Sequence, residues 1–354
     1  MPNRSMNNVK PEPSAALLEA VRHNCHIADA AHAGDYTLCT YLMKMRELYR
    51  WEHGLPLDAE LDSGEVGEWV RRREQWWESI EGEDFRPLPL NGSSVDPFEL
   101  RSVNDSLVRD GFVYSSGLGR NAAAHFFLAE LLDRQEFDGM TVLVSGREWA
   151  RDLVSPPAMT RDNTIFLRRE ALQRLLWERV QEWRWNRCDT PLGRALACYG
   201  LDDDLRAGLE RLTDDQMEAV LRHEIGEVMV GRDIESAWQE LLMAAAGRKA
   251  ELQLRALRDN LADAVSTLPW LLEQGRPELL HFHFGTLGPM RRHLSPTLVA
   301  AYRQWEADGD TEVLARAAEQ VRNHWRRLMD ELLAMAPTAD DADGISALIE
   351  ARTF

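Results

Sequence analysis

Cysteine and lysine are scarce in this 354-residue chain, and long apolar runs are absent. The four cysteines form no C-x-x-C pair and are too few for a disulfide framework in a chain of this length. No run of about 18 apolar residues occurs, so we expect no transmembrane helix and no membrane partner. The first residues also lack the apolar core of a signal peptide. Together these absences predict a cytoplasmic protein.

Positive charge is also in deficit. The net charge is −18 and the isoelectric point is about 5.0, and lysine occurs only at positions 10, 44 and 249. A general nucleic-acid or anionic-membrane binder needs a basic face, so we expect neither kind of partner. A small-molecule substrate, a protein partner or a second copy of the chain remain as candidates.

The pattern of apolar residues predicts the fold class. Spacings of three and four residues, typical of amphipathic helices, dominate the chain. Short β-branched runs at 112–114, 140–144 and 164–167 predict strands, and we predict a helix over 121–134 between the first two. We therefore expect a mainly α protein with a small central β-sheet, an α+β fold with a helical N-terminal subdomain and a helical C-terminal half.

Composition shifts along the chain predict its domain organisation. The segment 83–97 is rich in proline, glycine and serine, which is typical of a linker. The expected order is a disordered tail at 1–14, a helical subdomain at 15–82, the linker at 83–97, a main domain at 98–335 and a flexible acidic tail at 336–354.

The most informative segment is a predicted helix that ends at Gly231. Thr213 with Gln216 three residues later fits a capping box, so we place the start of the helix there. Within it, Glu224 and Glu227 fall near the apolar face. Buried carboxylates are costly unless they are paired, hydrogen-bonded or bound to a metal.

The same helix carries the string H-E-x-x-E, formed by His223, Glu224 and Glu227. It resembles the H-E-x-x-H motif of zincin metalloproteases, but Glu227 stands where the second histidine ligand would be. A histidine and a carboxylate still suit Zn²⁺, Fe or Mn. We expect His223 and Glu227 to bind a divalent metal, with Glu224 as general base or bridging ligand. Alternatively, the glutamates form structural ion pairs with arginines.

A second candidate lies on the first predicted helix. Cys25, Asp29 and His32 stand at i, i+4 and i+7, so one helical face presents all three. They could supply metal ligands, or they could form a buried polar network.

A third candidate is the H-x-H pair of His281 and His283, followed by Gly285, Gly288 and Pro289. These glycines and proline favour extended or turn structure, which would place both histidines on one face as further metal ligands. Alternatively, the histidines face solvent in a turn.

These candidates support three readings. The first is a metal-dependent cytoplasmic enzyme, either a Zn hydrolase or a non-haem Fe or Mn enzyme, built on the H-E-x-x-E helix. The second is a non-catalytic acidic helical protein that binds a protein partner and contains a buried polar network. The third is a thiol enzyme that uses Cys25.

Overall fold

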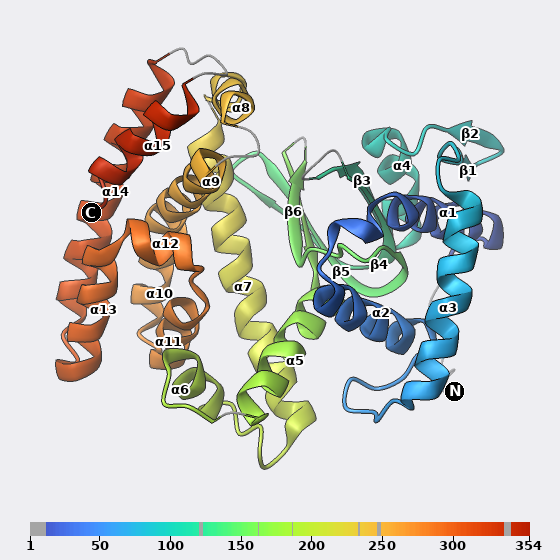
Figure 1. Cartoon of the computed structure of the whole chain (residues 1–354), viewed down its shortest axis with the longest axis horizontal. Coiled ribbons are helices and arrows are strands. Elements are labelled where there is room, and N and C mark those ends of the chain that lie inside the picture. The colour runs from blue at the N-terminus through green and yellow to red at the C-terminus, as the bar shows by residue number, and fades with distance from the viewer. Residues whose placement is uncertain are drawn as a thin grey trace, which may run out of the picture. The chain divides into compact units, whose positions relative to one another are not determined.

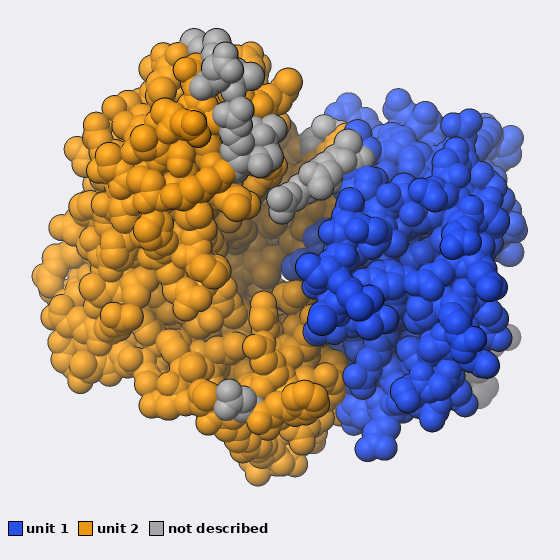
Figure 2. All heavy atoms as spheres, viewed as in Figure 1, with its two compact units in different colours: residues 1–157, 166–174 blue, residues 158–165, 175–354 orange. Residues whose placement is uncertain are grey.

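The computed structural model describes residues 12–119, 123–161, 163–185, 187–232, 234–245, 249–335 and 341–354. Contacts divide the chain into two compact units, coloured in Figure 2: unit 1 contains residues 1–157 and 166–174, and unit 2 contains residues 158–165 and 175–354. Of the predicted tails at 1–14 and 336–354, residues 1–11 and 336–340 lie outside the described residues.

Unit 1 begins with three helices whose starts are capped by polar side chains. Ser14, Thr37 and Asp62 each accept a hydrogen bond from the backbone N–H three residues later. Such caps satisfy backbone donors that the first turn of a helix leaves unpaired. The elements up to the main sheet are α1 (Ala15–His32), α2 (Leu38–Glu52), α3 (Ser63–Ile80), β1 (Leu88–Leu90), β2 (Ser93–Val95) and α4 (Leu100–Leu107).

The segment that we expected to be a linker, 83–97, contains the β1–β2 hairpin. Asn91 and Gly92 adopt φ values of 51° and 78° and form its turn, the conformation that two-residue hairpin loops favour. Leu88 is fully buried in the core that α1 also enters. The proline, glycine and serine of this segment therefore build a turn that holds apolar residues in the core.

The main sheet has five strands in the order β3-β4-β5-β7-β6, and β3–β4 and β4–β5 are antiparallel (Figure 1). The register between β4 and β5 shifts three times between Leu128 and Asp133, and such bulges increase twist. Strand β6 and the first two residues of β7 belong to unit 2. The strands are β3 (Phe112–Leu118), β4 (Ala124–Phe137), β5 (Met140–Arg151), β6 (Ala158–Arg161) and β7 (Thr164–Arg168).

The predicted helix over 121–134 is wrong, because residues 124–137 form strand β4; residues 121 and 122 lie outside the described part of the chain. The side chains of Phe126, Phe127, Leu128 and Ala129 are all fully buried. A strand buried on both faces shows no alternation, so its apolar run resembles that of a helix.

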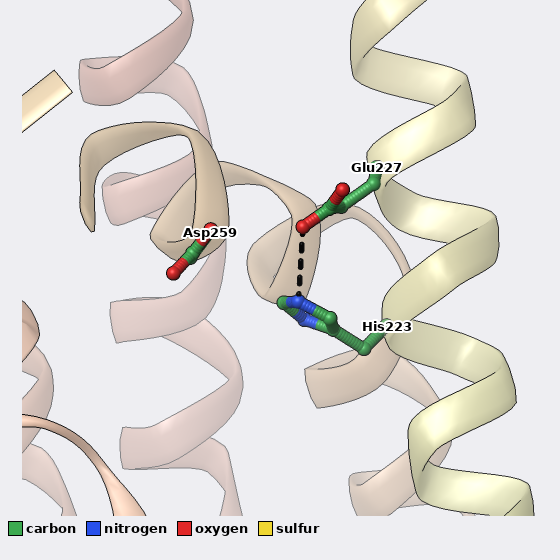
Figure 3. A group of neighbouring side chains, drawn as sticks. All are labelled: His223, Glu227 and Asp259. Atoms are coloured by element: carbon green, nitrogen blue, oxygen red, sulfur yellow. Dashed lines mark ion pairs between the residues drawn. The ribbon is translucent and has the colours of Figure 1, made fainter. Parts of the chain in front are cut away.

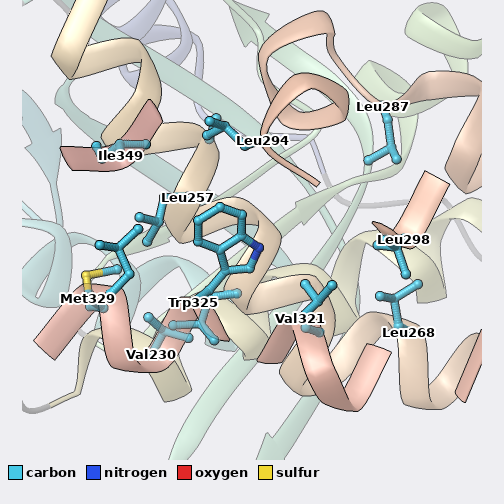
Figure 4. Packing of buried hydrophobic residues seen from close by; sticks show 14 of the residues in the cluster. Val230, Leu257, Leu268, Leu287, Leu294, Leu298, Val321, Trp325, Met329 and Ile349 are labelled. Carbon is cyan, nitrogen blue, oxygen red and sulfur yellow. The ribbon is translucent and has the colours of Figure 1, made fainter. Parts of the chain in front are cut away.

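Unit 2 is almost entirely helical. Helix α5 begins in unit 1 at Arg169 and continues into unit 2. The helices from α7 onward contribute to a core in which Trp325, Leu257 and Val321 are fully buried (Figure 4). The helices are α5 (Arg169–Trp185), α6 (Pro191–Ala197), α7 (Leu205–Gly231), α8 (Glu235–Ala244), α9 (Lys249–Ala262), the π-helical η4 (Asp263–Thr267), α10 (Leu268–Gln274), α11 (Pro277–Thr286), α12 (Pro289–Leu294), α13 (Pro296–Asp308), α14 (Thr311–Leu333) and α15 (Ala342–Ala351).

The predicted fold class, mainly α with a small β-sheet, is confirmed. The chain's end differs from the flexible tail that we expected, since α15 buries Ile345 and Ile349 completely. Within the described ranges, no helix combines the length and the apolarity needed to cross a membrane.

Candidate metal centre

Helix α7 carries the H-E-x-x-E string and is longer than its predicted form. It starts at Leu205, capped by Asp204, and ends at the predicted Gly231. The predicted capping box is wrong: Thr213 lies inside the helix, and its hydroxyl donates to the carbonyl of Leu209 at 2.7 Å.

A glycine lets α7 contact the backbone of the α9–η4 segment directly. A Cβ atom at Gly226 would lie 2.3 Å from the carbonyl oxygen of Ala262, so only glycine fits without displacement. Gly226 sits between His223 and Glu227 in sequence, and Ala262 sits between Asp259 and Asp263. This close approach therefore brings the H-E-x-x-E face against two aspartates.

One ligand atom from each of His223, Glu227 and Asp259 lies within 4.8 Å of the other two. Figure 3 shows His223 and Glu227 projecting from α7 toward Asp259 on the facing helix. The Nε2 atom of His223 lies 3.3 Å from Oε1 of Glu227. A metal with bonds of about 2.0–2.2 Å in tetrahedral geometry would hold its ligand atoms roughly 3.4 Å apart. The His223–Glu227 pair already has about this spacing, and the other ligand distances would close by at most about 1.4 Å.

Asp263 fixes the orientation of the histidine. Nδ1 of His223 lies 2.7 Å from Oδ1 of Asp263, which also accepts from the hydroxyl of Thr267 at 2.8 Å. Arg291 forms an ion pair with the other carboxylate oxygen. With Nδ1 engaged, Nε2 is the ring nitrogen that faces Glu227, as in carboxylate–histidine–metal arrangements.

The electrostatics of the group favour an ionised Asp263. Burial raises its pKa, but the charges of Arg291 and His223 outweigh burial and hold the pKa well below the usual range. Burial lowers the pKa of His223, but Asp263 and Glu227 raise it well above 6.5. The two neighbouring carboxylates thus favour the protonated form of His223, which lies between them.

Glu224 has a different environment from Glu227. The hydroxyl of Thr160 donates to its Oε2 at 2.7 Å. Burial and the neighbouring charge of Glu227 raise the pKa of Glu224 to about 7. By contrast, the hydrogen bond from His223 lowers the pKa of Glu227 despite its burial. Two carboxyl groups one turn apart thus differ in protonation near neutral pH, a pattern common among catalytic acids and bases.

The H-x-H pair was predicted to lie in extended or turn structure, and this prediction is wrong because α11 is a helix. In a helix, residues two apart point to different sides. His281 hydrogen-bonds to Tyr302 at 2.8 Å, whereas Nε2 of His283 lies 3.7 Å from Asp263. Only His283 reaches the edge of the site, and burial lowers its pKa to about 4.

The predicted face of α1 belongs to unit 1, where each residue has its own partner. Cys25 donates to the carbonyl of Phe126 at 3.4 Å, and Asp29 accepts from the backbone of Leu153 at 2.8 Å. His32 pairs with Asp35 at 3.1 Å. These contacts tie the helix to the sheet and to its own end.

Cys25 is poorly suited to act as a nucleophile. Its side chain is buried, and burial together with Asp152 and Asp29 raises the pKa of the thiol well above 9. A reactive cysteine needs a stabilised thiolate, and this environment favours the neutral thiol.

Sequence reasoning missed Asp259 and Asp263. They stand four residues apart in R-D-N-L-A-D-A, so they share a helical face, which was the available signal. Nothing in the sequence pairs that face with α7, because the two aspartates lie more than thirty residues from Glu227 in the chain.

Two family models match the chain. The N-terminal domain of DUF6866, described as a family of unknown function, matches residues 16–168, and the C-terminal domain of the same family matches residues 173–352. No curated protein and no solved structure matches it.

Proposed function

We propose, for a chain that belongs to the DUF6866 family, that it is a metal-dependent enzyme whose ion is bound by His223, Glu227 and Asp259. The observation that carries the proposal is the convergence of three ligand atoms, one of which belongs to a histidine whose other ring nitrogen is held by buried Asp263. A surface ion pair needs no such second carboxylate, whereas metal-binding histidines regularly have one.

The chemistry of the three ligands limits which metal ions the site would bind. One imidazole and two carboxylates suit Zn²⁺, Fe²⁺ or Mn²⁺ better than a soft ion that prefers thiolate. Binding replaces the proton on Nε2 of His223, so it releases a proton and strengthens as the pH rises.

Glu224 supports a hydrolytic reaction. It neighbours the ligands, and Thr160 orients one of its oxygens. In the proposed reaction, Glu224 would accept the proton of a water molecule as the water oxygen forms a bond to the carbonyl or phosphoryl centre of the substrate, and it would return that proton to the leaving group as the bond to that group breaks. An ion held by His223, Glu227 and Asp259 would supply the polarisation of the water. We further propose that the protein acts in the cytoplasm on a small-molecule substrate.

The first experiment is metal analysis of protein purified without chelator or histidine tag. We expect about one equivalent of Zn, Fe or Mn in the wild type, and its loss in Glu227→Gln and Asp259→Asn. Glu218→Gln is the matched control, since Glu218 lies on the same helix and pairs with Arg222; it should keep the metal. A wild type without metal, even after incubation with each ion, would refute the proposal.

Catalysis is tested separately from binding. Glu224→Gln should keep the metal but lose hydrolytic activity by about 10²–10⁴-fold, the usual contribution of a general base. The assay is turnover of chromogenic ester, phosphate and amide substrates by the metal-loaded protein. Equal turnover by wild type and Glu224→Gln would refute the proposed role of Glu224 as the general base.

The alternative of an acidic partner-binding protein draws support from α2. Leu38, Leu42 and Met43 expose 70%, 49% and 56% of their surface, and grouped apolar exposure is typical of interaction sites. This alternative predicts no bound metal, with His223, Asp263 and Arg291 acting only as an ion-pair network. The metal analysis therefore discriminates between the two readings.

A further inference from the structure

Unit 1 contains a cavity of about 310 Å³ that the proposed metal chemistry does not use. Its walls come from α1, α2, α3, β5 and the first turns of α5, all within unit 1. Trp51 and Trp149 form part of the lining. The lining also contains three glutamates and five arginines, and the arginines are Arg22, Arg73, Arg147, Arg151 and Arg174. Such an excess of arginine is unexpected in a chain of net charge −18.

The three lining glutamates already have arginine partners. Glu52 accepts from Nη2 of Arg73 at 2.7 Å, and Glu170 accepts from Arg174 at 2.5 Å. Glu148 accepts from Nε of Arg168 at 2.7 Å. Two of the five lining arginines, Arg73 and Arg174, are thus each paired with a lining glutamate, whereas Glu148 pairs with Arg168, which is not among the lining residues. Positive charge in the cavity wall therefore remains on the other three arginines.

The remaining arginines have weaker contacts. Arg22 donates to the carbonyl of Trp149 at 2.9 Å, and the guanidinium of Arg147 lies 4.1 Å from the centre of the Trp149 ring. Arg151 donates to the carbonyl of Asp152 at 3.4 Å, and its nearest carboxylate atom, on Glu148, lies 4.0 Å away. None of these contacts neutralises a charge at hydrogen-bond distance.

Arg151 and Arg174 also keep buried donors without an acceptor. Their side chains are 8% and 11% exposed. Among the residues that the structure describes, Nη1 of Arg151 and both Nε and Nη1 of Arg174 have no hydrogen-bond partner, and neither does Nε1 of Trp149. One acceptor, Oε2 of Glu148, is unpaired as well. Leaving a buried charged donor unpaired is costly, and the unpaired groups here are mostly donors.

We infer that this cavity binds the oxyanion group of a small molecule, a phosphate or a carboxylate, through Arg151 and Arg174. An oxyanion supplies the acceptors that these guanidiniums lack, and arginine is the side chain best shaped to hold it. Arg22 and Arg147 add positive charge, and Trp51 and Trp149 provide flat apolar walls for the rest of the ligand. The volume suits a metabolite rather than a macromolecule.

The test uses the full-length wild type first. Inorganic phosphate and succinate are titrated separately at constant ionic strength, with chloride as the compensating ion, and binding is followed by calorimetry and by thermal unfolding. We expect saturable binding of one of them with a dissociation constant of about 1 mM or tighter; the tighter probe identifies the class. No saturable binding of either, or an equal effect of chloride, means that water fills the cavity and overturns the inference.

Variants then locate the site. Arg151→Met and Arg174→Met should weaken binding at least about tenfold, since each removes charge-assisted hydrogen bonds. Arg134→Met is the control, because Arg134 is 56% exposed and pairs with Glu136 away from the cavity. If the buried variants do not fold, the exposed Arg22→Met carries the test and should also weaken binding. Unchanged affinity in all folded cavity variants, or an equal loss in Arg134→Met, overturns the assignment.

Discussion

Replacing Gly226 with alanine tests whether the contact between α7 and the α9–η4 segment builds the site. The added Cβ would lie 2.3 Å from the carbonyl oxygen of Ala262, and ordinary contact begins near 3.4 Å, so the two segments must separate by about 1 Å. A backbone atom cannot turn away as a side chain can. Overpacking of this kind costs about 3 kcal/mol, and the better helix propensity of alanine returns about 1 kcal/mol. We therefore expect a net loss of about 2 kcal/mol in the free energy of unfolding.

The same displacement should weaken metal binding. His223 and Glu227 flank Gly226 on α7, whereas Asp259 lies on α9, so separation of the helices pulls the donors apart. Metal–ligand distances tolerate only about 0.2 Å of deviation. The metal content of Gly226→Ala should therefore fall well below that of the wild type.

The assay is urea unfolding followed by circular dichroism, combined with metal analysis. Gly67→Ala in α3 is the matched control, since no atom lies within 4 Å of its added Cβ. It should gain about 0.5–1 kcal/mol from helix propensity alone. If Gly226→Ala is as stable as Gly67→Ala and keeps its metal, the contact does not position the site and the reasoning fails.

Two further predictions concern the core of unit 2 and a buried histidine of unit 1. Leu257 is fully buried, so Leu257→Ala should lower the free energy of unfolding by about 2–5 kcal/mol. Leu252 is 47% exposed, so the control Leu252→Ala should lower it by about 0.5 kcal/mol or less. Urea unfolding measures both values. Burial and the charge of Arg73 lower the pKa of His26 to about 3. The unfolded chain therefore binds a proton more readily between pH 6.5 and 3, and stability falls as the pH drops through that window, by at most about 1.4 kcal/mol per pH unit. The slope should flatten in His26→Gln; equal slopes in the two proteins would contradict the assigned environment.

The helices were the predictable part of the fold, because their signals are local. Ser14 preceded a periodic apolar pattern and does cap α1, and Gly231 does end α7. The start of α7 was misjudged, since Thr213 bonds back to the preceding turn inside a longer helix. A threonine hydroxyl satisfies either role, and the local sequence does not distinguish them.

The sequence before and after strand β4 carried two conflicting signals, a hairpin turn and an apolar run that also fits a helix. Asp138 and Gly139 adopt φ values of 47° and 76° and close the β4–β5 hairpin. An Asp-Gly pair between apolar segments is the strongest short-range hairpin signal. The continuous apolar run before it matched a helical face equally well, because a strand buried on both sides loses its alternation.

Only the residues of the candidate site that lie on α7 could be predicted from the sequence. His223 and Glu227 share a face of one helix, so sequence spacing alone places them together. Asp259 and Asp263 reach that face only through tertiary packing, and the cause is a missing side chain at Gly226 rather than a recognisable motif. A glycine inside a helix is ordinarily a cost of about 1 kcal/mol. Its presence between two candidate ligands therefore indicates a position where another backbone comes close.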